Sequence, residues 1–276
     1  MNTENLEIEK SSTAPLVIKM GGSTLSAVDT TFDDLAYVQK LGAFPVVVHG
    51  GGNLISEWVK RAGFESKFVR GLRVTDHFTL QNAVAVLAGL VNKQLVASLT
   101  FAGARAVGLS GVDASLFQSE ILDSELGFVG GIPKVDTYIL DQIISSGIIP
   151  VIAPIALKIP IEGMDNQGGL NILNVNGDSS SGALAASLHA RQLIFLTDVE
   201  GVLDIDGRVI KIMTEEDVKE LLDNGIASGG MIPKLEAAIY ALPYVEKVNI
   251  IDGRKPNAII HCYEGNDTGT TITRSL

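Results

Sequence analysis

Hydrophobic residues in this chain gather in short runs that end at glycines. The run from Pro45 to Val48 is rich in β-branched residues, and His49 and three glycines, Gly50 to Gly52, follow it directly. Such a run predicts a short buried strand, and Leu54 to Arg61 reads as the start of a helix. A strand, a glycine loop and a helix N-terminus together favour an anion site, because glycines expose backbone N–H groups and the helix end carries partial positive charge. A tight turn without a ligand is the alternative interpretation.

The same pattern occurs nearer the N-terminus. Leu16 to Lys19 predicts a strand that ends in a turn with Gly21 and Gly22, and a helix is predicted from Phe32 to Leu41. Lys19 therefore lies where a buried strand meets a glycine turn. An unpaired charge is costly there, so we expect something anionic to meet Lys19. A simple salt bridge or a surface position is the alternative.

Two arginines lie on a predicted hairpin. Residues 64–75 alternate loosely between apolar and polar and contain Gly71, which predicts a hairpin or flap over the strand ends. Either Arg70 or Arg73 could clamp a carboxylate through two parallel hydrogen bonds, and a solvated side chain is the alternative for each.

The longest helical pattern runs from Asp76 to Ala102 and is apolar nearly all round. A helix of this kind is either fully buried or half of a subunit interface. We favour the interface, which predicts a homodimer built on this helix.

The rest of the chain continues the alternation of strands and helices. Further strands are predicted at 104–109, 148–152, 192–196 and 247–251, a second hairpin at 114–135, and helices at 136–145, after 178, from Thr214 and from Leu235 to Leu242. This order predicts the α/β class with a mostly parallel, helix-covered sheet. Ligands of such a sheet bind at the carboxyl edge of the strands, where the glycine loops gather.

Polar side chains are concentrated in two of these loops. Asn174, Asn176 and Asp178 alternate along an extended segment and so point to one side, where they could orient a ligand and nearby cationic groups. The alternative is that Asp178 is the N-cap of the following helix and that the asparagines are turn residues, and Asp178 could serve both roles. Residues 228–234 contain two more glycines and end at Lys234, just before the helix from Leu235.

Composition narrows the class of protein. The 276 residues are 46% hydrophobic and only 5% aromatic, which suits a buried parallel sheet. The net charge of −11 argues against binding to nucleic acid or to an anionic membrane. Residues 1–14 form a polar tail without a signal peptide, no run approaches the ~20 apolar residues of a membrane span, and Cys262 is the only cysteine. We therefore expect a cytoplasmic protein without disulfides.

Phosphoryl transfer is the chemistry that fits these loops. Glycines, Lys19, Lys234, Arg73 and Asp178 suit the binding of phosphate and the neutralisation of developing charge. The chain lacks the G-x-x-x-x-G-K-[ST] loop of P-loop NTPases and the G-x-G-x-x-G of Rossmann dehydrogenases, and its four histidines lack zinc-site spacing.

Eight motifs occur in the order in which one known family carries them. They are V-I-K-M-G-G, V-V-V-H-G-G-G-N, R-G-L-R-V-T, G-L-V-N-K, A-V-G-L-S-G-V-D, L-N-V-N-G-D, L-T-D-V-E-G-V-L and G-G-M-I-P-K. From about residue 15 to its C-terminus the chain resembles the acetylglutamate kinases of the amino acid kinase family. K-x-G-G points only to the wider family, whereas R-G-L-R-V-T together with N-V-N-G-D is specific to this branch.

The resemblance implies an open three-layer αβα sandwich with two lobes. Residues 1–14 would form a flexible tail, residues 15–190 a lobe for acetylglutamate binding and dimerisation, and residues 191–276 a lobe for ATP. The implied activity is ATP-dependent phosphorylation of the γ-carboxylate of N-acetyl-L-glutamate, the second step of arginine biosynthesis. Mg²⁺ would be held by ATP phosphates and water rather than by a protein metal site.

The resemblance also implies a role for each matching residue. The catalytic residues would be Lys19, Lys234 and Asp178. The substrate would bind to Gly51, Gly52, Arg73, Asn174 and Asn176. ATP and its phosphates would bind to Gly21, Gly22, Thr197, Asp198, Gly201, Val202, Leu203, Ile226, Ser228, Gly229 and Gly230.

Two other functions remain open. A sibling kinase for aminoadipate or glutamate on an acidic carrier protein needs a basic surface, which the charge of −11 disfavours. A non-catalytic amino-acid or nucleotide sensor is disfavoured because both lysines and Asp178 are retained. Arginine-inhibited family members have a longer N-terminal helix, and His261 stands where their pattern has a glutamate. We therefore predict an arginine-insensitive homodimer.

Overall fold

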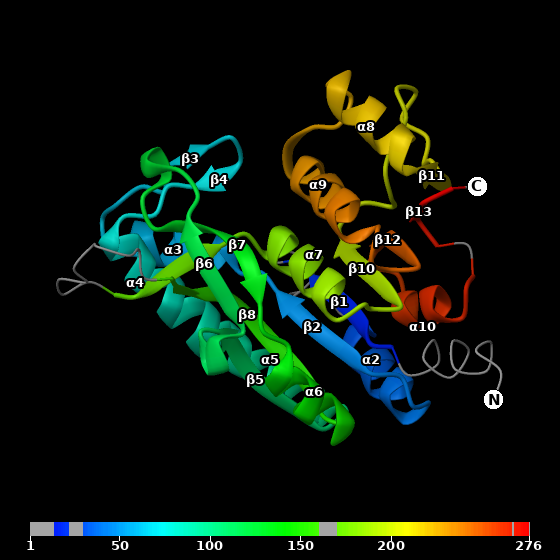
Figure 1. The fold of residues 1–276 in the computed structure, drawn as a ribbon, viewed down its shortest axis with the longest axis horizontal. Coiled ribbons are helices and arrows are strands. Elements are labelled where there is room, and N and C mark those ends of the chain that lie inside the picture. The colour runs from blue at the N-terminus through cyan, green and yellow to red at the C-terminus, as the bar shows by residue number, and fades with distance from the viewer. Residues whose placement is uncertain (1–13, 22–29, 160–169, 267, 276) are drawn as a thin grey trace.

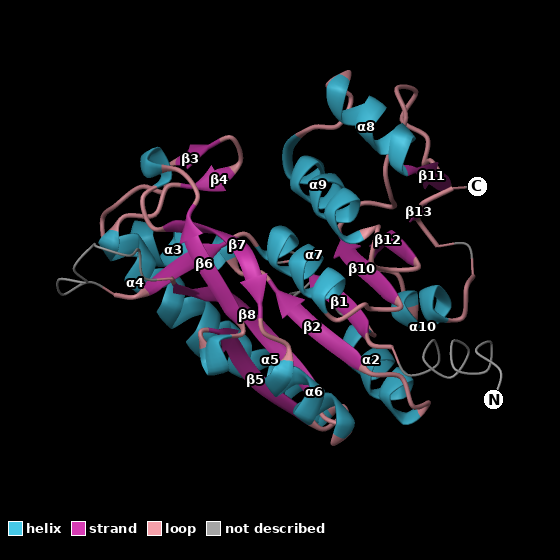
Figure 2. Cartoon of the chain, in the orientation of Figure 1, coloured by secondary structure: helices cyan, strands magenta, loops and turns pink. Residues whose placement is uncertain are grey.

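One large sheet runs through the molecule, and helices cover both of its faces (Figures 1 and 2). The computed structural model describes residues 14–21, 30–159, 170–266 and 268–275. Within these ranges the strands lie in the order β11-β13-β12-β10-β1-β2-β8-β6-β7-β9, and β5 pairs with β8 beside this path. A separate two-stranded sheet, β3-β4, projects from the upper left of Figure 1.

The elements have the following bounds. The strands are β1 Leu16–Met20, β2 Pro45–His49, β3 Phe68–Val69, β4 Leu72–Arg73, β5 Ala106–Gly111, β6 Phe117–Ile121, β7 Val129–Val135, β8 Ile149–Lys158, β9 Ile172–Val175, β10 Gln192–Thr197, β11 Ile212–Thr214, β12 Lys247–Asp252 and β13 Thr270–Thr273. The helices are α2 Thr31–Lys40, α3 Gly52–Arg61, α4 His77–Val84, η2 Ala85–Val91, α5 Asn92–Phe101, η3 Asp113–Ser115, η4 Ser124–Leu126, α6 Tyr138–Ser145, α7 Gly177–Ser187, α8 Glu215–Asp223, η5 Gly229–Met231, α9 Ile232–Ala241 and α10 Ala258–Tyr263.

Most neighbouring strands run parallel. β5, β8, β2, β1, β10 and β12 form a parallel block. Antiparallel pairs join β12 to β13, β6 to β7 and β8 to β9. The predicted α/β sandwich with a mostly parallel sheet is therefore confirmed, and so are the hairpins at 64–75 and 114–135.

Alternate residues of β1 face opposite helical layers. Val17 belongs to a core cluster with Leu184 of α7 and Leu235 of α9, whereas Ile18 belongs to a second cluster with residues of α2 and α10. Because side chains alternate along a strand, Lys19 lies on the same face as Val17, toward α7 and α9. The strand thus aims its one charged residue at the helices that carry the rest of the site.

The long helix predicted at 76–102 differs from the prediction in two ways. It runs from His77 to Phe101, and its middle part, Ala85–Val91, is a π-helix. It is also long and apolar enough to cross a membrane by length and composition, contrary to the expectation that no segment would be. Leu87 and Leu95 nevertheless lie in the second core cluster, which is the position of a core helix.

Helix α9 begins earlier than predicted. It starts at Ile232 rather than at Leu235, with Pro233 in its first turn. Proline is well tolerated there because the first helical N–H groups have no intrahelical partner. Lys234 is consequently a residue of the first helical turn and not of the preceding loop.

The predicted lobe boundary at 190/191 falls inside the sheet. β1 and β10 come from the two sides of this boundary, yet they are hydrogen-bonded neighbours. The division into lobes stays a prediction, and residues 1–13 of the predicted tail lie outside the described residues.

Candidate active site

Two lysines meet one carboxylate at the carboxyl edge of the sheet. Lys19 Nζ lies 2.7 Å from Asp178 Oδ1, and Lys234 Nζ lies 3.4 Å from Asp178 Oδ2. The side chains of Lys19, Lys234 and Asp178 are 9%, 15% and 8% exposed. Lys19 is therefore salt-bridged, as the alternative interpretation had it, but two ammonium groups share one carboxylate. The three residues together keep one unmatched positive charge.

Each of the three residues is held by a different element. Lys19 lies on β1, Asp178 in the first turn of α7 and Lys234 in the first turn of α9. Asn176 is the N-cap of α7, because its side chain accepts the N–H groups of Asp178 at 2.8 Å and Ser179 at 3.1 Å. The N-cap role considered for Asp178 is thus wrong, and its carboxylate faces the two lysines instead.

The surroundings of Lys234 disfavour its charged form. Burial lowers the pKa of the Lys234 ammonium below its ordinary value, and the opposing attraction of Asp178 does not restore it. The nearby charge of Lys19 lowers this pKa further. An anionic ligand between the two lysines would remove this imbalance.

A cavity of about 230 Å³ opens beside Lys19 and Asp178. It is lined by all the predicted substrate residues, namely Gly51, Gly52, Arg73, Asn174 and Asn176. Helix α3 begins at Gly52 with Gly51 as its N-cap, so its first N–H groups lack intrahelical acceptors. Among the described residues, neither of these two glycine N–H groups donates to a backbone carbonyl. The cavity therefore combines cationic side chains with available backbone donors.

Arg73 is built into the wall of this cavity. Its Nη2 donates to Gly52 O at 2.7 Å and to Ser56 Oγ at 2.9 Å, and its Nη1 donates to Ser66 Oγ at 2.6 Å. The guanidinium also lies 4.7 Å from the centre of the Phe68 ring. Burial lowers the pKa of the Arg73 guanidinium below its ordinary value. Within the described ranges no carboxylate pairs with it, so it is suited to receive one from a ligand.

A second cavity, of about 320 Å³, lies between the loop after β10 and the start of α9. Its lining includes most of the predicted ATP residues: Thr197, Asp198, Gly201, Val202, Leu203, Ile226, Ser228 and Gly230. Lys234 lines this cavity, whereas Asp178 and Lys19 line the first. The ion pair of Lys234 with Asp178 therefore connects the two cavities.

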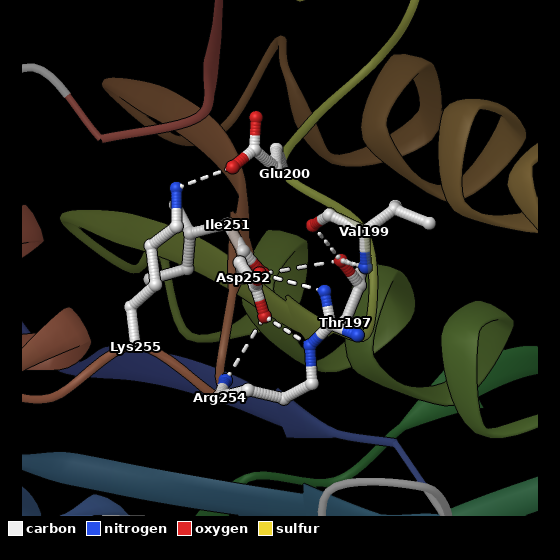
Figure 3. Close-up of polar contacts among 7 residues, drawn as sticks. All are labelled: Thr197, Val199, Glu200, Ile251, Asp252, Arg254 and Lys255. Carbon is white, nitrogen blue, oxygen red and sulfur yellow. Dashed lines mark hydrogen bonds and ion pairs between the residues drawn. The ribbon is translucent and has the colours of Figure 1, made fainter.

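A polar network fastens the loop after β10 to the end of β12 (Figure 3). Thr197 Oγ1 lies within hydrogen-bond distance of carbonyl oxygens in this loop and in β12, at 2.8 and 3.1 Å. Arg254 binds Asp252 through two parallel hydrogen bonds of 2.8 and 2.9 Å, and Lys255 donates to Glu200 at 2.9 Å. Thr197 and Val199 also line the second cavity, so their contacts tie part of its wall to β12.

Some predicted residues are not brought to the cavities. Gly21 and Gly229 line neither cavity, and Gly22 lies outside the described residues. Arg70 forms an ion pair with Asp123 at the surface. Of the two arginines on the hairpin, only Arg73 therefore belongs to the site.

The sequence prediction missed the residues that hold Arg73 and Asn174. Ser56 follows Gly52 by one helical turn, and Phe68 is the cross-strand partner of Arg73 in the β3–β4 hairpin. Both relations follow from helix and hairpin spacing and could have been found. Thr75, which accepts from Asn174 Nδ2 at 3.2 Å, could not, because that contact joins distant parts of the chain.

The chain belongs to the amino acid kinase family, which it matches over residues 14–251. Its relatives narrow the assignment within this family. It is 40% identical over 268 residues to the acetylglutamate kinase of Dehalococcoides mccartyi strain BAV1, with 97% of each chain covered. It is 42% identical to the acetylglutamate kinase of Cereibacter sphaeroides strain ATCC 17029, with 94% of this chain and 87% of the relative covered. The resemblance predicted from the eight motifs is confirmed.

Solved structures agree on the fold. A crystal structure of a Streptococcus mutans UA159 protein superposes with a TM-score of 0.81 at 28% identity, covering 96% of this chain and all of that one. A carbamate kinase from Giardia lamblia bound to AMP-PNP superposes with a TM-score of 0.68 at 17% identity, covering 96% of this chain and 100% of its own. At this identity the second match supports the fold alone.

Proposed function

We propose that this chain transfers the γ-phosphoryl group of ATP to the γ-carboxylate of N-acetyl-L-glutamate, the second step of arginine biosynthesis. The observation that carries the proposal is the group Lys19–Asp178–Lys234, which joins two cavities. One cavity offers an arginine and helix N-terminal amides, and suits an acidic amino-acid derivative. The other suits a nucleotide.

The reaction needs no general base. A γ-carboxylate has a reference pKa of about 4.3 and is already ionised at pH 7. One carboxylate oxygen forms a bond to the γ-phosphorus, the bond from this phosphorus to the β,γ-bridging oxygen breaks, and the electron pair leaves with ADP. The products are an acyl phosphate and ADP.

The obstacle to this transfer is repulsion between two anions. Lys19 reaches the junction from the sheet and Lys234 from α9, so their charges oppose the repulsion from two sides. We assign Asp178 the task of holding both ammonium groups in place, because it contacts each of them. Arg73 would bind the α-carboxylate and Asn174 the amino-acid end of the substrate, beside Gly51 and Gly52.

Magnesium would enter this site with ATP. Among the described residues, no three His, Cys, Asp or Glu side chains gather where they could hold a metal ion. Phosphate oxygens and water are the ligands that Mg²⁺ commonly uses in such a case. When bound, the ion supplies further neutralisation of phosphate charge.

A substrate panel tests the proposal. The protein is incubated with MgATP and N-acetylglutamate, glutamate, aspartate or carbamate, and acyl phosphate is trapped as the hydroxamate. We expect product from N-acetylglutamate alone. Activity on free glutamate without activity on acetylglutamate contradicts the assignment. Turnover only with a carrier-linked aminoadipate or glutamate identifies the sibling kinase, and ligand binding without any turnover identifies a sensor.

The two lysines can be tested separately from binding. We expect Lys19→Ala and Lys234→Ala each to reduce kcat far more than they raise KM, because their charges act mainly in the transition state. A rise in KM with unchanged kcat contradicts the catalytic roles.

A further inference from the structure

A buried polar cluster beneath the glycine loop has no role in the mechanism above. His49 ends β2 directly before Gly50, and Asn92 begins α5 at the end of the π-helix. Both side chains are completely buried. A buried polar group without hydrogen bonds is costly, so each of these side chains should be oriented to satisfy its partners, and its orientation can be deduced from them.

The orientation of the Asn92 amide follows from three contacts. Its Nδ2 donates to Val151 O at 2.8 Å and to Leu109 O at 3.2 Å, and its Oδ1 accepts from Lys93 Nζ at 3.0 Å. Two carbonyls on one side and an ammonium on the other exclude the flipped amide. A Cβ atom at Gly108 would lie 1.9 Å from Asn92 Oδ1, so a glycine on β5 makes room for this amide.

The partner of Nδ1 determines the tautomer of His49. Nδ1 lies 2.8 Å from Gly50 O, and because a carbonyl oxygen can only accept, Nδ1 carries the proton and donates. In the neutral ring Nε2 is then unprotonated, and it lies 3.3 Å from Asn92 Nδ2. Burial lowers the pKa of His49 to about 4, so the ring is neutral at pH 7.

The bond to Gly50 O orients the next peptide unit. In a trans peptide the C=O and the following N–H point in opposite directions. With Gly50 O directed at the buried imidazole, the Gly51 N–H is directed away from it. Gly51 itself lines the substrate cavity. A Cβ at Gly51 would lie 2.6 Å from Leu87 Cδ2, so packing against the π-helix also restricts this residue.

We propose that His49 is a positioning residue for phosphoryl transfer: its Nδ1–H, presented by Asn92, holds the Gly50–Gly51 peptide so that the Gly51 N–H faces the reacting anions. This inference rests on the proposed function, since it assigns a task within that site. His49 itself touches no reactant. It acts through the backbone donor that it orients.

Two substitutions of His49 distinguish the role of Nδ1 from that of Nε2. The amide nitrogen of asparagine is as many bonds from Cβ as Nδ1, and that of glutamine as many as Nε2. We expect His49→Asn to retain most of kcat, because it can still donate to Gly50 O. We expect His49→Gln to lose roughly 10²-fold in kcat, the scale of one misplaced oxyanion donor, with little change in the KM for acetylglutamate.

Two further measurements exclude a purely structural effect. ADP affinity measured by calorimetry, together with the melting temperature, should be alike in the two variants, because the nucleotide cavity does not include His49. In ¹⁵N-histidine-labelled wild-type protein, NMR should show Nε2 of the buried ring as the unprotonated nitrogen. An Nε2–H tautomer, or equal kcat in the two variants, overturns the inference. Wild-type protein inactive on acetylglutamate would instead overturn the proposed function.

Discussion

At the level of single residues, the site depends on charges that are buried and incompletely matched. Lys19 and Lys234 share the single carboxylate of Asp178, and Arg73 is surrounded by neutral hydrogen-bond acceptors and the ring of Phe68. Burying charge without a full complement of counter-charge is unfavourable in the folded chain. The arrangement becomes favourable when anionic ligands bind, which explains why a kinase for a carboxylate keeps it.

The two glycines at the start of α3 should respond differently to alanine. A Cβ at Gly51 meets Leu87 Cδ2 at 2.6 Å, whereas at Gly52 the nearest atom is Arg73 Nη2 at an ordinary 3.6 Å. We expect Gly51→Ala to lower the free energy of unfolding by about 1–3 kcal/mol through overpacking. Gly52→Ala should leave stability nearly unchanged and raise the KM for acetylglutamate, because its methyl group lies beside Arg73.

Urea unfolding and steady-state kinetics of both variants test this expectation. A Gly51→Ala protein as stable as wild type, or a Gly52→Ala protein that unfolds more easily, would contradict it.

His49 should make the protein less stable in acid. The unfolded chain protonates this residue near its ordinary pKa of 6.5, whereas the folded chain keeps it neutral down to about 4. Between these values the unfolded state binds more protons, so stability present above pH 6.5 is lost as the pH falls toward 4. The loss from this group is at most ~3 kcal/mol. The other charged group in the cluster is Lys93, whose Nζ donates to Asn92 Oδ1 at 3.0 Å.

Urea unfolding at pH 7 and pH 4.5 measures this loss. In His49→Asn the corresponding fall in the free energy of unfolding should be smaller than in wild type. The same fall in both proteins would show that His49 is not the titrating group.

At the level of elements, the crossing of α7 and α9 sets the distance between Asp178 and Lys234. One turn beyond Asp178, a Cβ at Gly182 would lie 2.8 Å from Ala237 O and 3.1 Å from Ala237 Cβ. Ala237 itself lies three residues after Lys234, on the same face of its helix. The two helices can approach this closely because Gly182 has no side chain.

Gly182→Ala should therefore separate Lys234 from Asp178. We expect kcat to fall about 10- to 100-fold, the scale expected for an approximately 1 Å displacement of a catalytic group. Intrinsic helix propensity alone would predict a gain in stability for this variant, because alanine favours a helix over glycine by ~1 kcal/mol. Kinetics and thermal unfolding are compared with Ser187→Ala, at an exposed position of the same helix. Full activity with raised stability in Gly182→Ala would refute the role of this contact.

The hydrophobic pattern predicted the elements themselves well, because apolar residues recur with a different period in strands than in helices. It predicted the strand before each glycine loop, both hairpins and the long helix, and these are confirmed. It placed the start of α9 three residues late, because the Gly-Gly-Met-Ile-Pro sequence reads as a loop when no packing is known. It also missed the π-helix at Ala85–Val91, since this segment has the same apolar composition as an α-helix.

At the level of the whole molecule, the order of strands assembles the site. β2, β1 and β10 are neighbours in the sheet, although most of the substrate cavity wall lies between β2 and β10 in sequence. Parallel pairing places the carboxyl ends of these three strands at one edge of the sheet. The two cavities and the ion pair between them follow from this order.

We predict that the long helix His77–Phe101 forms the subunit interface. Leu90 is 37% exposed and Phe101 is 96% exposed, so apolar surface remains uncovered in a single chain. We expect sedimentation to give twice the chain mass of 29.2 kDa, unchanged by arginine. Leu90→Glu should shift the protein toward monomer, because a charge in an apolar interface is costly. A hexamer inhibited by micromolar arginine would overturn this prediction.

The sequence by itself determined the class of fold, the strand ends that carry chemistry and, through its motifs, the family. The fold class and the strand ends depend on local periodicity, and the family depends on short motifs whose combination is rare. Only the tertiary structure decided which arginine belongs to the site, that Asn176 rather than Asp178 caps α7, and that His49 and Asn92 support the glycine loop. Each of these depends on contacts between residues far apart in the chain, whose distances are set by strand order and helix packing and not by any local pattern.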